Sequence, residues 1–194
     1  MPTTSQPHPL PPAVVSRAAA IKLLAMDCDG VLTDGTMSFV GGPDGKIMET
    51  KAFHSHDGLG LLLCHHLGLP VGVISGRKSQ ALAEQAARIH IAYVQQGFLD
   101  KEEPFEKMLA DAAINAEEAA FIGDDFTDIP IMRQAGLAVA VANARPEVKA
   151  HAHYVSLAAG GHGAVREVIE IILHAKGLWD SIVKKYGLAE GREP

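Results

Sequence analysis

The sequence is poor in the features that mark secreted, membrane-spanning or nucleic-acid-binding proteins. Its 194 residues contain two cysteines, Cys28 and Cys64. That is too few for the disulfide framework of a small secreted domain, so we expect reduced thiols in a cytoplasmic protein. No apolar run approaches the about 20 residues that cross a bilayer, which predicts no membrane contact. Lys and Arg number 17 against 23 Asp and Glu and do not cluster, so a nucleic-acid partner is not expected either.

The composition that remains is that of a soluble globular domain, with 47% apolar and 21% charged residues. The first twenty residues are rich in proline and serine and begin without basic charge, so residues 1–20 are predicted to be a mobile N-terminal arm. Residues 21–177 are predicted to form one domain, and residues 178–194 a C-terminal tail.

Short apolar runs alternate with amphipathic stretches along the domain. This alternation predicts an α/β fold of Rossmann-like type, a mostly parallel sheet with helices on both faces. The predicted strands are 21–26, 71–75, 91–94, 119–123 and 137–142, and the predicted helices are 57–67, 78–89, 102–113, 127–135 and 163–175. Residues 36–53 break the rhythm, because two strand-like runs flank the turn GGPDG; they predict an inserted β-hairpin.

Acidic residues follow two of the predicted strands. Asp27 and Asp29 come after strand 21–26, and Asp124, Asp125 and Asp128 come after strand 119–123. Ligands bind at the carboxyl edge of such sheets, where these carboxylates would crowd together unless a cation neutralises them. Oxygen-only ligands favour Mg²⁺. The alternative is that these aspartates are ordinary solvated turn residues.

Three further polar residues are predicted at the same edge. Ser75 lies between a strand and the predicted helix 78–89, so its hydroxyl and the following amides would form a phosphate site at a helix N-terminus, or Ser75 would be a plain N-cap. Arg77 adds a cation beside it, or is a solvated surface residue. Lys101 follows strand 91–94 and could point its ammonium at the carboxylates. The ten histidines show no zinc-ligand context.

Taken in order, DCDGV (27–31), ISGR (74–77), Lys101 and GDDFTD (123–128) resemble the four motifs of the haloacid dehalogenase-like hydrolases. The resemblance covers roughly residues 21–175. It implies a Mg²⁺-dependent phosphatase in which Asp27 is the nucleophile and Asp29 the general acid and base. It further implies that Mg²⁺ is held by Asp27, Asp124 and the backbone carbonyl of Asp29, that Ser75 and Lys101 hold the phosphate, and that Asp125 and Asp128 are supporting residues.

The sequence leaves no room for the cap domain that members of this superfamily usually carry. The gaps between motifs hold only the hairpin and single helices, so the site should be open within one chain. Closure of the site would then have to come from another chain. Capless members with such a hairpin resemble enzymes that hydrolyse 3-deoxy-D-manno-octulosonate 8-phosphate, a step in lipopolysaccharide precursor synthesis. FHSHDGLG (53–60) and AGGHGAVRE (159–167) strengthen this likeness, which implies a sugar-acid phosphate substrate and a homo-oligomer, a tetramer. The implied substrate-binding residues are Ser75, Gly76, Arg77, Lys101, His54, His56, Asp57, Gly58 and Arg166.

Two alternatives remain open at this point. His56, Leu62 and Gln85 stand where the resemblance leads us to expect basic residues, so the substrate could be another sugar-acid phosphate, for instance a nine-carbon keto-deoxy sugar acid 9-phosphate. A signalling receiver module also uses acidic residues, a hydroxyl and a lysine. In receivers, however, the acidic pair precedes the phosphoacceptor aspartate, whereas here the order is that of the hydrolases.

Overall fold

Six parallel strands form the central sheet of the structure, a computed structural model that describes residues 10–188. Their spatial order is β5-β4-β1-β6-β7-β8. Every residue of β1, β4, β6 and β7 is buried, as parallel strands covered on both faces require. The predicted α/β class is confirmed. The strands of this sheet are β1 (Leu23–Met26), β4 (Val71–Ser75), β5 (Tyr93–Gln96), β6 (Ala119–Gly123), β7 (Leu137–Ala140) and β8 (Tyr154–Val155).

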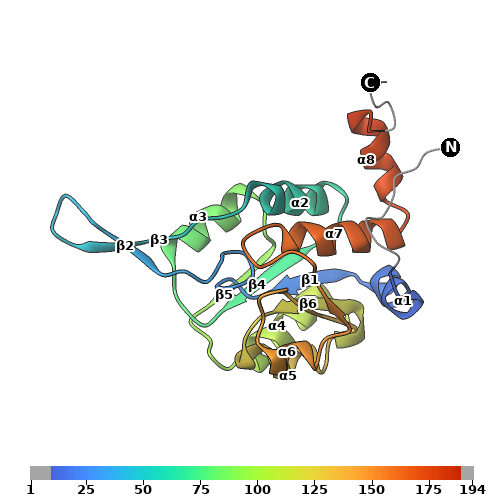
Figure 1. The fold of residues 1–194 in the computed structure, drawn as a ribbon, viewed down its shortest axis with the longest axis horizontal. Coiled ribbons are helices and arrows are strands. Elements are labelled where there is room, and N and C mark those ends of the chain that lie inside the picture. The colour runs from blue at the N-terminus through green and yellow to red at the C-terminus, as the bar shows by residue number, and fades with distance from the viewer. Residues whose placement is uncertain (1–9, 189–194) are drawn as a thin grey trace.

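Helices cover both faces of the sheet (Figure 1). The layer above it in the figure contains α2, α3 and α7, and α4, α5 and α6 lie below it. The α-helices are α1 (Pro12–Ala20), α2 (Ser55–His66), α3 (Gln80–Arg88), α4 (Glu102–Ala112), α5 (Ile129–Met132), α6 (Pro146–Lys149), α7 (Ala164–Ala175) and α8 (Trp179–Tyr186), with two short 3-10 helices, η1 (Ala116–Glu118) and η2 (Phe126–Asp128). No helix within residues 10–188 is long and apolar enough to span a membrane.

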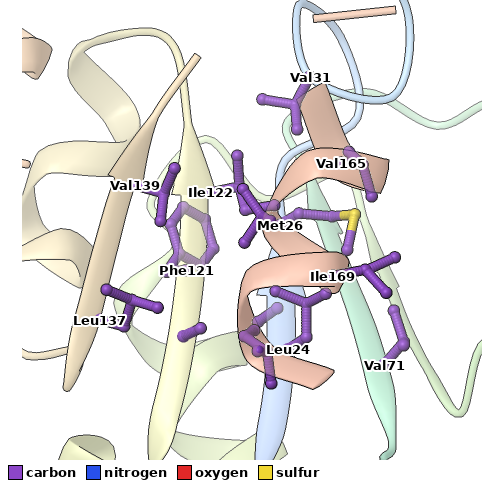
Figure 2. Packing of buried hydrophobic residues seen from close by; sticks show 14 of the residues in the cluster. Leu24, Met26, Val31, Val71, Phe121, Ile122, Leu137, Val139, Val165 and Ile169 are labelled. Atoms are coloured by element: carbon purple, nitrogen blue, oxygen red, sulfur yellow. The ribbon is translucent and has the colours of Figure 1, made fainter. Parts of the chain in front are cut away.

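Buried apolar side chains fill the space between α7 and the central strands (Figure 2). Leu24 of β1 and Phe121 of β6 are completely buried, and so are Val165 and Ile169, four residues apart on one face of α7. Burying side chains of this size stabilises the fold by about 1.5–3 kcal/mol each. The strand ends that carry the acidic motifs are therefore fixed by rigid packing beneath them.

The predicted hairpin is present and projects away from the sheet (Figure 1). Its antiparallel strands are β2 (Ser38–Gly41) and β3 (Ile47–Thr50). Between β1 and β4 the chain forms only this hairpin and α2, and between β5 and β6 only α4 and η1. Nothing in these two connections is large enough to be a cap domain, as the sequence predicted.

The structure corrects several predicted boundaries. The mobile arm is wrong for Pro12–Ala20, which forms α1: Pro12 suits the first turn of a helix, and Val14 and Ala18 lie one turn apart in the core. Residues 1–9 lie outside the described residues, as do residues 189–194 of the predicted tail, whose first part forms α8. The predicted helix 127–135 is reduced to η2 and α5. The short elements α6 and β8 were not predicted.

Candidate active site

Asp27 and Asp124 follow adjacent strands of the sheet. Met26 pairs with Ile122 in the register of β1 and β6, and the Asp27 N–H donates to the Ile122 carbonyl at 3.0 Å. The chain continues from β1 toward β4 on one side and later returns to place β6 on the other. The two aspartates thus stand at a topological switch point, the usual ligand crevice of an open α/β sheet.

Lys101 is buried between two of the carboxylates. Its Nζ lies 2.9 Å from Asp27 Oδ1 and 2.7 Å from Asp128 Oδ1. Burial disfavours the ammonium, but the carboxylates of Asp128 and Asp27 outweigh it and raise the pKa of Lys101. Burial raises the pKa of Asp27 to about 6 against the opposing effect of Lys101. Lys101 is therefore a permanent cation beside Asp27, placed as the sequence predicted.

The carboxylates of Asp27, Asp124 and Asp128 can each place an oxygen within 4.8 Å of the others. Both oxygens of Asp128 are already engaged, Oδ1 by Lys101 and Oδ2 by the backbone N–H groups of Asp124 and Asp125. Asp124 Oδ1 is buried and has no hydrogen-bond donor within the described chain. Burial, Asp27 and Asp128 together raise the pKa of Asp124 to about 8.

This donor set fits Mg²⁺, because a hard cation would satisfy the orphaned oxygen of Asp124 and relieve the repulsion that raises its pKa. Asp27 and Asp124 are the residues that could hold it. The Gly30 backbone, one residue after Asp29, lies so close to the Asp124 carboxylate that a side chain at position 30 would collide with it. This contact places the Asp29–Gly30 peptide beside the Asp124 carboxylate, where the Asp29 carbonyl would have to lie to be the predicted metal ligand. Asp125 is exposed and caps η2.

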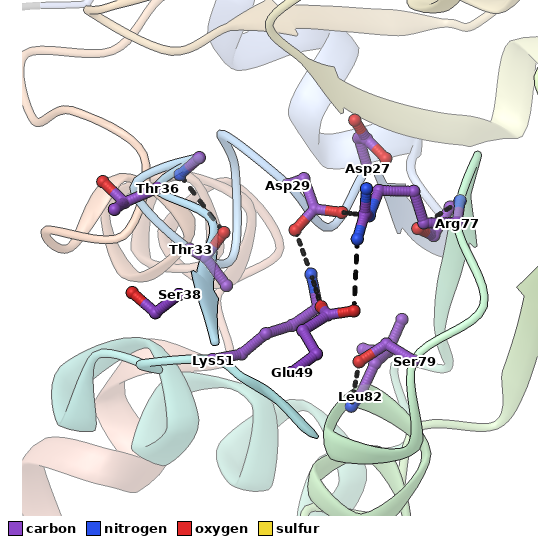
Figure 3. A network of polar contacts seen from close by, with 12 residues as sticks. Asp27, Asp29, Thr33, Thr36, Ser38, Glu49, Lys51, Arg77, Ser79 and Leu82 are labelled. Atoms are coloured by element: carbon purple, nitrogen blue, oxygen red, sulfur yellow. Dashed lines mark hydrogen bonds and ion pairs between the residues drawn. The ribbon is translucent and has the colours of Figure 1, made fainter. Parts of the chain in front are cut away.

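The Asp29 carboxylate does not belong to this acidic cluster but to a second, mixed-charge group (Figure 3). Asp29 Oδ1 accepts a hydrogen bond from Lys51, and Asp29 Oδ2 lies 3.9 Å from Arg77 Nε. Glu49 pairs with both cations, at 2.9 Å from Lys51 and 3.2 Å from Arg77. We call Asp29, Glu49, Lys51 and Arg77 the polar ring.

Sequence reasoning missed Glu49 and Lys51. Both belong to the hairpin arm, Glu49 in β3 and Lys51 directly after it. The available signal was their spacing of two residues, which places both side chains on one face of an extended segment. Burial lowers the pKa of Lys51, but hydrogen bonds to Asp29 and Glu49 outweigh burial, so the net shift is upward.

Ser75 ends β4 at the same edge and is buried, but the prediction that it stands at a helix N-terminus is wrong. Helix α3 begins only at Gln80, with Ser79 as the N-cap that accepts the Leu82 N–H at 3.3 Å. Ser79 itself donates its N–H to Gln96 at 2.7 Å, which keeps the residues before it in a loop. In that loop the Arg77 N–H donates to Ser75 Oγ at 3.2 Å, and Gly76 lies between them.

The implied residues around α2 form a separate group. Asp57 is buried and accepts N–H bonds from Gly163 at 3.2 Å and Arg166 at 2.7 Å, so it anchors the start of α7 and is not open to a substrate. The Arg166 guanidinium pairs with Glu170 at 2.6 Å. His54 stacks edge-to-face with the exposed His56. Hydrogen bonds and ion pairs within residues 10–188 do not connect this group to Asp27 or Lys101. Gly58 faces Gln85, and Leu62 packs on the core.

The AGGHGAVRE segment packs directly against the loop that follows Asp27. The Gly161 N–H donates to the Val31 carbonyl at 2.9 Å, and a side chain at Gly160 would collide with the Gly30 carbonyl. Glu167 holds the loop before α7 by accepting the Leu157 and Ala158 N–H groups at 2.9 and 3.0 Å. This segment therefore fixes the position of the loop that follows Asp27.

A parallel α/β sheet with paired acidic motifs and a buried lysine at its carboxyl edge is the arrangement of a carboxylate-dependent phosphoryl-transfer site, which hydrolases and receiver modules share. A family model described as haloacid dehalogenase-like hydrolase matches residues 80–169. The chain belongs to the haloacid dehalogenase-like hydrolases, in the branch that contains the 3-deoxy-D-manno-octulosonate 8-phosphate phosphatases. The receiver-module alternative is thereby set aside.

That branch is established by full-length similarity. The chain is 40% identical over 172 residues to the 3-deoxy-D-manno-octulosonate 8-phosphate phosphatase of Salmonella typhimurium, covering 89% of both chains. The crystal structure of the Yersinia pestis phosphatase superposes with a TM-score of 0.84 at 40% identity, covering 89% of this chain and 91% of that one. The Moraxella catarrhalis phosphatase, solved with magnesium, phosphate and KDO, gives 0.83 at 35% identity, covering 89% and 97%.

Proposed function

We propose that the chain is a Mg²⁺-dependent phosphatase that hydrolyses 3-deoxy-D-manno-octulosonate 8-phosphate to the free sugar acid and phosphate in the cytoplasm, as a step toward a lipopolysaccharide precursor. The observation that carries the chemistry is the group of Asp27, Lys101 and Asp124, in which one buried Asp124 oxygen lacks a donor among the described residues. The substrate rests on the similarity to phosphatases of that name.

The positions of the side chains support the following reaction. Lys101 lies against Asp27 and offsets the repulsion between this carboxylate and the phosphate dianion. Asp27 attacks phosphorus, the bond to the sugar oxygen breaks, and an aspartyl-phosphate forms. Asp29 gives its proton to the leaving oxygen and then accepts one from the water that hydrolyses the intermediate. Mg²⁺, held by Asp27, Asp124 and the Asp29 carbonyl, supplies positive charge beside the transferring phosphoryl group.

Substrate contacts are proposed at the open side of this centre. Ser75, the Gly76 backbone and Lys101 hold the phosphate, and Arg77 is the exposed cation nearest to Asp29, at 3.9 Å. His54 and His56 are proposed to meet the sugar acid from α2. Asp57 and Arg166 support this surface through the start of α7.

We propose a homo-oligomer, a tetramer by resemblance, because the hairpin exposes Phe39, Val40, Ile47 and Met48 to solvent. An apolar surface of this kind on an open two-stranded arm favours contact with a second copy. A neighbouring subunit would also close the site, which has no cap domain of its own.

Phosphate release from a panel of sugar-acid phosphates tests the function. We expect turnover of the eight-carbon 8-phosphate with Mg²⁺ and none with EDTA. Faster turnover of the nine-carbon 9-phosphate would favour the alternative substrate. The observation that supports this alternative is that His56, Leu62 and Gln85 stand at positions where basic residues were expected. Full activity in EDTA would contradict the proposed chemistry.

A further inference from the structure

The polar ring fixes the carboxylate of Asp29 from the hairpin side. We propose that Lys51 is a positioning residue, which binds one oxygen of Asp29 and thereby leaves the other oxygen to carry the proton to and from the reacting groups. This inference rests on the proposed function, since it assigns Asp29 the role of general acid and base.

The two oxygens of Asp29 have different surroundings. Lys51 Nζ donates to Oδ1, whereas Arg77 Nε lies 3.9 Å from Oδ2, beyond hydrogen-bond distance. The side chain of Asp29 is 21% exposed, so the carboxylate can meet a substrate. A carboxyl group transfers protons well only when its reactive oxygen is held in reach of the leaving group.

Lys51 is placed to hold Asp29 and not to bind the substrate. Its side chain is only 3% exposed, and its ammonium is shared between Asp29 and Glu49. Arg77, by contrast, is 45% exposed and is the cation of the polar ring that faces solvent. Glu49 connects the two, so the hairpin fixes both the proton-transferring carboxylate and the substrate-facing cation (Figure 3).

The test compares two phosphate esters on the same preparation of the Lys51→Met variant. The sugar-acid phosphate has an alkoxide leaving group that needs a proton, whereas p-nitrophenyl phosphate releases a stabilised anion that does not. Positioned proton transfer supplies roughly 10²–10⁴-fold. We expect Lys51→Met to lower kcat on the sugar-acid phosphate by about 10- to 100-fold and on p-nitrophenyl phosphate by much less. Any loss of folded protein cancels from this ratio.

Lys46→Met is the matched control, because Lys46 lies on the same hairpin with its side chain 82% exposed. It should leave the ratio unchanged. In an Asp29→Asn background, Lys51→Met should add no further loss on the sugar-acid phosphate, because residues that act through one another are not additive. If Lys51→Met does not fold, Lys51→Gln, a neutral side chain that still fills the site, is measured in the same way.

Equal losses on the two esters, or an additive loss in the Asp29→Asn background, would overturn the inference. A failure of this inference can be distinguished from a failure of the proposed function. Wild-type protein that hydrolyses p-nitrophenyl phosphate and not the sugar-acid phosphate contradicts the proposed substrate alone. An unchanged ratio in Lys51→Met, with wild-type protein active on both esters, contradicts the role of Lys51 alone.

Discussion

Asp27 combines two properties that rarely coexist, deep burial and, in its proposed role, a negative charge that is available for attack. Lys101 at 2.9 Å makes this possible, since its positive charge compensates for the burial of the carboxylate. The same contact explains why the lysine is buried, which is unusual for this residue type. Asp27 and Lys101 therefore form one electrostatic unit.

Replacing Asp27 by Asn tests its assignment as the nucleophile. The amide fills the same space but cannot attack phosphorus, so kcat should fall by on the order of 10⁴-fold or more. The protein should remain folded, because the substitution removes one of the charges that repel Asp124. Phosphate release and thermal unfolding measure the two effects. Asp111→Asn, at an exposed ion pair with Lys107, is the control, and near-normal turnover in Asp27→Asn would refute the role.

Sequence patterns located the acidic residues because strand ends in a parallel sheet converge on one edge. Residue types alone do not separate Asp29 from Asp124, since both are carboxylates after a strand, and only the family resemblance implied different roles for them. What separates them is a tertiary contact with Lys51, brought in by the hairpin. Asp57 was misjudged for the same reason: its role depends on the N–H groups of Gly163 and Arg166, more than 100 positions away in the chain.

At the scale of elements, two loops packed back to back determine where the metal carboxylates stand. The segment before α7 presses on the Gly30 backbone, and Gly30 in turn lies against Asp124. Both contacts need glycine: a side chain at Gly160 would occupy the space of the Gly30 carbonyl, and a side chain at Gly30 would occupy the space of the Asp124 carboxylate. Position 160, in the AGGHGAVRE segment, therefore requires glycine for steric reasons.

Gly160→Ala should disturb this stack. The added methyl meets the Gly30 carbonyl, which is backbone and cannot rotate away, so we expect a loss of about 1–3 kcal/mol in stability. The shift should also raise the Mg²⁺ concentration needed for half-maximal activity. Thermal unfolding and Mg²⁺ titration of activity measure both. Gly41→Ala, where a side chain meets open space, is the matched control. An unchanged Mg²⁺ requirement would contradict the argument.

The exposed apolar residues of the hairpin lie on both of its faces. The pair Val40 and Met48 lies on the face opposite to Glu49, so these two residues can be changed without altering the polar ring. We expect Met48→Lys to break the oligomer, because it places like charges where copies of the chain would meet. Light scattering should show a smaller particle, and turnover should fall with the loss of a closed site. Lys46→Gln at the exposed hairpin tip is the control. An unchanged mass would argue against this interface.

On the scale of the whole molecule, the sheet was the easiest part to predict. Strands buried on both faces appear as continuous apolar runs, which is why β1, β4 and β6 were located closely and the α/β class is confirmed. Elements with weak local signals were lost. Helix α1 lies in a proline-rich stretch and is held by packing on α7 and not by its own propensity, and β8 has only two residues.

The free energy of unfolding should depend on pH through the titration of Asp27 and Asp124. The pKa values of Asp124 and Asp27, about 8 and about 6 against ordinary values of 3.8, mean that the folded metal-free chain holds protons that the unfolded chain releases. Stability without metal therefore falls as pH rises from about 4 to about 8. Mg²⁺ binds the ionised carboxylates, so its stabilising effect should increase over the same interval.

The measurement is the melting temperature at pH 6, 7 and 8 in EDTA and in Mg²⁺. We expect the difference between the two conditions to widen toward pH 8, because metal binding then no longer has to displace a proton from Asp124. The Asp124→Asn variant is the matched control, since its amide has no such proton and lacks one ligand charge; its difference should be small at every pH. A difference that stays constant in the wild-type chain would show that Asp124 is already ionised without metal, and would contradict the raised pKa of Asp124.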